Sequence, residues 1–81
     1  MNTRIAVISI IVEKIENISK VNEILSLYGN YIIGRLGLPY HEKKVNIISI
    51  TINAPQNITN SLSGKIGNID GVHTNTVFCN V

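Results

Sequence analysis

The first long apolar stretch, Arg4–Glu13 (RIAVISIIVE), is the feature that most constrains the fold of this chain. Its many Ile and Val residues favour a β-strand. Side chains alternate between the two faces of a strand, and here both alternating sets are almost entirely apolar. A strand that is apolar on both faces is typically buried on both. We therefore expect a central strand whose two faces are both covered.

A second long strand is predicted over Lys44–Ala54 (KVNIISITINA). One of its faces carries three isoleucines that we expect to pack against helices: Ile48, Ile50 and Ile52. The other face is semi-polar, and we expect it to meet the sheet of a partner through Val45 and Ile47.

Apolar residues three and four apart over Ile18–Tyr28 predict a first helix. Asn17 is the expected N-cap, with its side chain accepting from the first free backbone amides. Gly29 is the expected left-handed residue after the helix. A narrower stripe of Ile58, Leu62 and Ile66 predicts a second helix. We expect Gly64 to allow this helix close to the sheet and Gly67 to end it.

Two less regular strands complete the pattern. Tyr31–Leu38 reads as a strand interrupted by a bulge near its glycines, followed by a loop over residues 39–43. Asp70-Gly71 predicts a turn, and the more polar Val72–Val81 predicts an edge strand. The order is strand, helix, strand, strand, helix, strand. Right-handed crossovers then give one α+β domain over residues 1–81, a ferredoxin-like sandwich with sheet order 4-1-3-2 and both helices on one face.

Composition predicts association. Only 15% of the 81 residues are charged and 44% are hydrophobic, whereas about 25% charged residues is usual. Because two helices cover one face of the sheet, we expect the other face to form a subunit interface in a homo-oligomer, a dimer or tetramer. The residues expected there are Ile5, Val7, Ile11, Val45 and Ile47.

Charge and cysteine content exclude several classes of protein. The net charge is +2 without a basic stripe, which argues against nucleic-acid binding. The single cysteine, Cys79, excludes an internal disulfide and fits a reducing compartment. The apolar run Ile5–Val12 is too short to span a bilayer. We expect a soluble, cytoplasmic protein.

Three segments carry a family resemblance: Tyr28–Pro39 (YGNYIIGRLGLP), Ile48–Pro55 (ISITINAP) and Leu62–Val72 (LSGKIGNIDGV). They resemble a family of small proteins assigned to regulation of the iron-only hydrogenase system. The resemblance implies an ACT-like, ferredoxin-like fold, similar to the metal-sensing domain of nickel-responsive repressors. It also implies pairing through sheets or edges, often with a small effector bound between subunits.

The chain departs from both relatives of that family. ACT modules that bind amino acids usually have a glycine in the loop before the first helix, whereas Lys14–Asn17 contains none. The repressors carry a DNA-binding segment ahead of this domain, and here the first strand begins near Arg4. Direct DNA binding is therefore not expected.

Candidate reactive residues are few. His41, His73 and Cys79 are nucleophile, base or metal-ligand types, but their spacing follows no catalytic or metal motif. His73 and Cys79 lie about 20 Å apart along one strand, so one ion would need His41 or another subunit. We expect no catalytic residue, no cofactor and no metal. A metal sensor built from these three residues across subunits stays an alternative.

Arg35 is the most interesting charge, because it lies between Gly34 and Gly37 and near Tyr31. Its guanidinium group can hold a carboxylate or phosphate, so a small effector, if one binds, is expected between subunits near Gly34, Arg35, Gly37 and Tyr31. Alternatively, Arg35 pairs with Glu42 or a neighbouring subunit. The tyrosines of this region, Tyr28, Tyr31 and Tyr40, are expected at an interface rim. The leading hypothesis is a non-enzymatic, ACT-like regulatory or sensing module. The other is a structural adaptor that binds a second protein through an unpaired strand edge.

Overall fold

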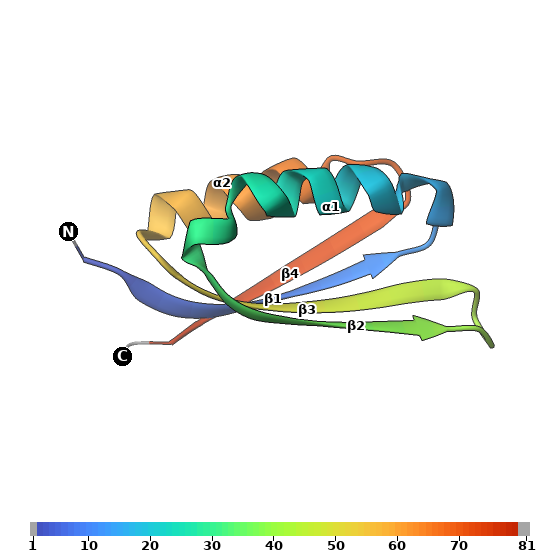
Figure 1. Ribbon diagram of the computed structural model, residues 1–81, viewed down its shortest axis with the longest axis horizontal. Coiled ribbons are helices and arrows are strands. Elements are labelled where there is room, and N and C mark those ends of the chain that lie inside the picture. The colour runs from blue at the N-terminus through green and yellow to red at the C-terminus, as the bar shows by residue number, and fades with distance from the viewer. Residues whose placement is uncertain (1, 80–81) are drawn as a thin grey trace.

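The computed structural model describes residues 2–79 as two layers, a four-stranded sheet and a pair of helices (Figure 1). The elements in chain order are β1 (Arg4–Val12), α1 (Ile18–Leu27), β2 (Ile32–Tyr40), β3 (Val45–Ala54), α2 (Gln56–Gly67) and β4 (Val72–Cys79). Short 3-10 turns, η1 (Ile15–Asn17) and η2 (Gly29–Tyr31), flank α1.

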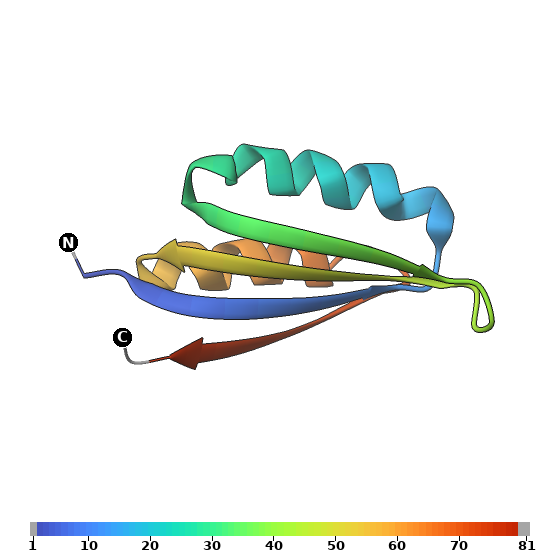
Figure 2. The same cartoon turned by 60° about the horizontal axis from the view of Figure 1, so that its bottom comes forward.

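The sheet order is β2-β3-β1-β4, which is the predicted order counted from the other edge. All three strand pairs are antiparallel. Both helices lie on the same side of the sheet, and no element of residues 2–79 covers its other side (Figures 1 and 2). The predicted ferredoxin-like architecture is confirmed.

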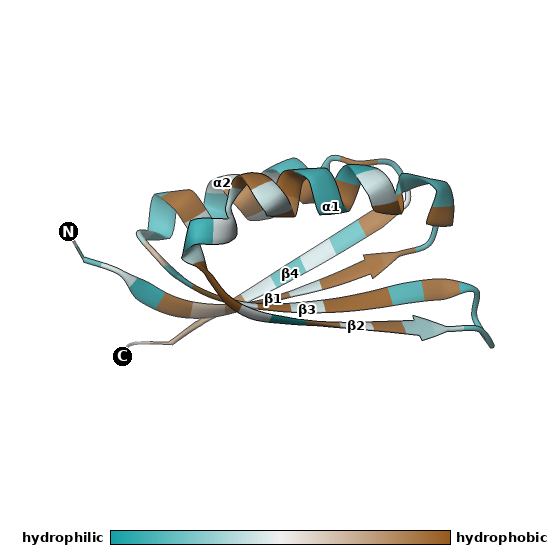
Figure 3. Cartoon of the chain, viewed as in Figure 1, coloured by the Kyte–Doolittle hydropathy of each residue, from teal (hydrophilic) through white to brown (hydrophobic). Residues whose placement is uncertain are grey.

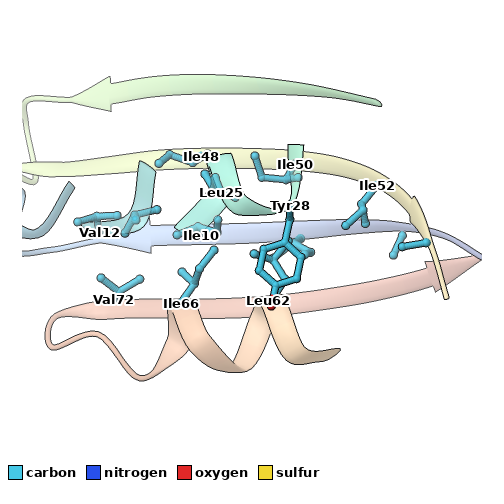
Figure 4. Packing of buried hydrophobic residues seen from close by; sticks show 14 residues of the cluster. Ile10, Val12, Leu25, Tyr28, Ile48, Ile50, Ile52, Leu62, Ile66 and Val72 are labelled. Atoms are coloured by element: carbon cyan, nitrogen blue, oxygen red, sulfur yellow. The ribbon is translucent and has the colours of Figure 1, made fainter. Parts of the chain in front are cut away.

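The core lies between the helices and the two central strands. Residues of β1 and β3 alternate in burial, and Ile8, Ile10, Ile50 and Ile52 are fully buried beneath the helices. Leu25 from α1 and Leu62 and Ile66 from α2 close over them (Figure 4). Apolar residues recur at helical spacing in α1 and α2 because these positions face the isoleucines of the sheet. Hydropathy colouring shows apolar segments on the helices and along both central strands (Figure 3).

The ends of the first helix differ from the prediction. Asn17 precedes α1, but its side chain makes no capping hydrogen bond. Instead its amide donates to the Asp70 carbonyl oxygen at 2.8 Å and links the start of the helix to the turn before β4. Gly29 is not left-handed, because the chain continues from α1 into the turn η2. The left-handed glycine is Gly71, with φ of 75° in the predicted turn.

Two further expectations were wrong. Pro39 and Tyr40 belong to β2 rather than to a loop, and the hairpin turn contains only residues 41–44. A proline is tolerated there because β2 is an edge strand. Gly64 is exposed, and a Cβ atom on it would meet nothing within 4 Å, so it does not bring α2 close to the sheet. Gly67 ends α2 as expected.

Within the described residues, neither helix is long and apolar enough to cross a membrane.

Candidate functional site

The face of the sheet that the helices leave uncovered is the most distinctive surface of the molecule. Strand register places its side chains in rows that cross all four strands. One row is Leu38, Ile47, Ile11 and His73; the next is Leu36, Ser49, Ser9 and Asn75; the third is Gly34, Thr51, Val7 and Val77. We call this surface the open face. Apolar rows thus lie on either side of a more polar row.

Large apolar side chains on the open face are accessible to solvent. Leu36 and Leu38 expose 58% and 52% of their surface, and Val77 exposes 66%. Val7, on a central strand, still exposes 38%. Monomeric soluble proteins rarely expose contiguous apolar patches larger than a few hundred Å². The open face therefore has the character of an interaction surface.

The five residues expected at a subunit interface all lie on this face: Ile5, Val7, Ile11, Val45 and Ile47. They come from the two central strands, whose other faces pack against the helices. The structure adds apolar residues from the edge strands, notably Leu36, Leu38 and Val77.

A β-bulge decides which residues of β2 reach the open face. Ile32 pairs with Ile52, but Gly34 pairs with Thr51, so one extra residue of β2 is accommodated at Ile33. The insertion shifts the alternation by one position. Ile32 packs against the core, whereas Leu36 and Leu38 point to the side away from the helices.

The open face is hollowed at the end nearest the β2–β3 hairpin. This hairpin lies at the opposite end of the sheet from the start of β1 and the end of β4 (Figure 2). The hollow has a volume of about 560 Å³. Its lining consists of Ile11, Glu13, Tyr40, Lys43, Val45, Ile47 and His73. We call it the hairpin-end hollow.

Polar groups surround the apolar floor of this hollow. His73 Nε2 contacts a Glu13 carboxylate oxygen across the β1–β4 pair. The Tyr40 hydroxyl group donates to Glu42 at 3.0 Å. Lys43, on the hairpin, also lines the hollow. The hollow thus combines an apolar floor with charges of both signs at its rim.

The residues expected to bind an effector do not form one site. Arg35 faces the helix layer, where its Nη2 donates to Asn22 Oδ1 of α1 at 2.8 Å. With Gly37 it lines a smaller hollow of about 220 Å³ between α1 and β2. Gly34 occupies a position on the open face, and Tyr31 belongs to η2. The neutral amide of Asn22, rather than Glu42, is the partner of the guanidinium group.

Tyr28 was wrongly expected at an interface rim, because it is buried in the core with only 9% of its surface exposed. Its hydroxyl group lies 3.1 Å from the Ser61 hydroxyl group, and Lys65 Nζ lies 5.3 Å from the ring centre. The Lys65 ammonium group and the Ser61 hydroxyl group hold the pKa of Tyr28 below its ordinary value. Tyr31 and Tyr40 are exposed.

The candidate metal ligands are dispersed over one chain. His73 opposes Ile11 at one end of β4, and Cys79 opposes Ile5 at the other. His41 lies in the hairpin. The part of the chain that the structure describes contains no group of three or more His, Cys, Asp or Glu side chains able to hold a metal ion.

Comparison with known proteins identifies the family. Residues 4–76 match the family described as "TM1266-like: Iron-only hydrogenase system regulator, putative". The chain belongs to this family. A solved structure, that of the uncharacterized protein TM1266 from Thermotoga maritima, is 30% identical to the chain with a TM-score of 0.92. The similarity covers 98% of this chain and all of that one. None of the curated proteins compared matches the chain.

Sequence reasoning named several residues of this hollow, including His73, but did not bring them together, and it did not single out Glu13 or Lys43. Glu13 directly follows β1, Lys43 lies in the hairpin and His73 lies in β4, and only the strand register brings them to one end of the sheet. The alternation of side chains along the last strand did carry a signal, because it places His73 on the same face as Val77.

Proposed function

We propose that the chain is a non-enzymatic, ACT-like regulatory or sensing module that works as a homo-oligomer, in which two subunits pair through their open faces. The family description, which names a regulator, supports the regulatory part. The observation that carries the pairing is the uncovered apolar face itself, with Val7, Leu38 and Val77 exposed on it.

The size of the open face favours a second copy of the chain as its occupant. A sheet of four strands, about 4.8 Å apart and about eight residues long at about 3.3 Å per residue, has a face of roughly 500 Å². A pair of subunits would therefore bury about 1,000 Å², the size at which specific interfaces begin. If about 600 Å² of this is apolar, burial gives about 15 kcal/mol before an association cost of about 4 to 15 kcal/mol.

Shape and charge agree with this arrangement. Sheets pack face to face about 10 Å apart through small and branched side chains, and the open face is rich in these. Its middle row is polar but uncharged, with Ser9, Ser49 and Asn75, so pairing would bury no charge there.

Light scattering coupled to size exclusion, at protein concentrations from 1 to about 100 µM, tests the proposal. We expect the wild-type chain to be a dimer or a multiple of one. Val7→Lys introduces a charge at the centre of the open face and is expected to give monomers. Leu27→Lys is the matched control, because Leu27 is 75% exposed on α1 and lies on the helix layer.

A wild-type chain that is monomeric at 100 µM would refute pairing. If Val7→Lys and Leu27→Lys dissociate the oligomer equally, the subunit interface does not lie on the open face. Far-ultraviolet circular dichroism shows whether each variant retains the fold.

A further inference from the structure

The hairpin-end hollow has the composition of a ligand site. Three branched aliphatic side chains form its floor, and all are only half-buried within one chain: Ile11, Val45 and Ile47. The ring of Tyr40, 43% exposed, forms a wall. Small-molecule sites in proteins are mostly apolar, with a few polar groups that fix orientation, and occupy about 300 to 1,000 Å³. A volume of about 560 Å³ falls within that range.

The charged groups at the rim of the hollow indicate which charge a ligand would carry. Each carboxylate near the hollow already has a partner: Glu13 contacts His73, and Glu42 accepts from the Tyr40 hydroxyl group. Lys43 differs, because no carboxylate among the described residues lies within ion-pairing distance of its ammonium group. Lys43 is therefore the charged group of the lining that has neither a hydrogen-bond nor an ion-pair partner among the described residues.

We infer that the hairpin-end hollow binds a small organic anion with an apolar body. The anionic group lies beside the Lys43 ammonium group, and the body packs on Ile11, Val45 and Ile47. Pairing through the open face, as proposed above, would place a second subunit over the hollow. The inference depends on that function for its regulatory meaning, although the lining itself comes from one chain.

The smaller hollow beside Arg35 is a weaker candidate for the same ligand. Its guanidinium group already donates to Asn22. Its volume of about 220 Å³ lies below the usual range for a ligand site.

Nuclear magnetic resonance titration of the full chain with three matched probes tests the inference. The probes are 3-phenylpropanoate, its neutral amide and 3-phenylpropylamine, which share one apolar body and differ in charge. We expect 3-phenylpropanoate to shift the backbone amides of Ile11, Val45 and Ile47 saturably. It should bind about fivefold more tightly than the amide, since an exposed ion pair contributes up to about 1 kcal/mol. The amine should bind most weakly.

Two variants that each remove one positive charge locate the anion. Lys43→Gln should reduce the affinity for 3-phenylpropanoate to that for the amide. Lys20→Gln, on α1 in the helix layer, should leave it unchanged. The same spectra show that each variant is folded.

Equal affinities for the three probes, unchanged binding by Lys43→Gln, or no saturable shift at the floor residues would overturn the inference. Scattering on the same samples separates this result from the oligomeric state. A dimer that binds no anion refutes the ligand alone, whereas a monomer that binds it refutes the pairing alone.

Discussion

Thr59 offers a sharp test of the helix layer. Its side chain is fully buried in the first turn of α2, and its hydroxyl oxygen has no hydrogen-bond partner among the described residues. An unsatisfied buried hydroxyl group costs about 1 to 3 kcal/mol. Valine has the same shape, and its helix propensity is close to that of threonine. Thr59→Val should therefore increase the free energy of unfolding by about 1 to 2 kcal/mol.

Thermal unfolding at one fixed protein concentration measures this effect, because association also shifts the melting temperature. For a domain of this size about 1 kcal/mol corresponds to about 4 to 8 °C, so Tm should rise by roughly 4 to 15 °C. Thr74→Val is the matched control. The Thr74 hydroxyl group donates to the Ser63 carbonyl oxygen at 3.4 Å, and its loss should lower stability by about 1 kcal/mol. If Thr59→Val leaves Tm unchanged or lowers it, the Thr59 hydroxyl group has a partner and the reasoning is wrong.

Further predictions concern the glycines and the turn before β4. Gly71→Ala should lower the free energy of unfolding by about 2 kcal/mol or more, since φ is 75° and the new Cβ atom would lie 2.5 Å from Lys14 Cγ. Gly64→Ala, in open space within α2, should instead raise it by about 0.5 to 1 kcal/mol, and urea unfolding of the two variants measures both changes. Lys14 holds the pKa of Asp70 below 3.8, and Asp70 holds the pKa of Lys14 above 10.5. Their contact should therefore stabilise the fold between about pH 4 and pH 10, fading as the pH falls through the lowered pKa or rises through the raised one. Asp70→Asn should lower Tm at pH 7 and have less effect at pH 2; an equal effect at both values would contradict this linkage.

The central strands were predictable because their pattern leaves little choice. A segment such as Arg4–Val12, apolar on both faces, is stable only between two paired strands and beneath a cover. Its buried alternating set could be read directly from the spacing of Ile8 and Ile10. The helix stripes followed from the same logic, since Leu62 and Ile66 recur at the helical period.

The second strand was predicted less well, because its facing depends on the bulge at Ile33. Gly34 and Gly37 indicated a β-bulge in this strand, but the sequence did not show at which residue it lies. One residue of difference decides whether Arg35 points to the helices or away from them. The arrangement around Lys43 also required tertiary information, because Glu13 and His73, which line the same hollow, come from segments far apart in the sequence.

The central position of β1 has a consequence for biosynthesis. β1 is made before both of its partners, because β3 and β4 begin only at Val45 and Val72. At about 5 to 20 residues per second, β3 begins roughly 2 to 7 s after β1 is complete. During that interval the most apolar segment of the chain has no neighbouring strand on either edge. During this interval β1 is thus prone to aggregation, and chaperones that bind apolar segments would be expected to act on it.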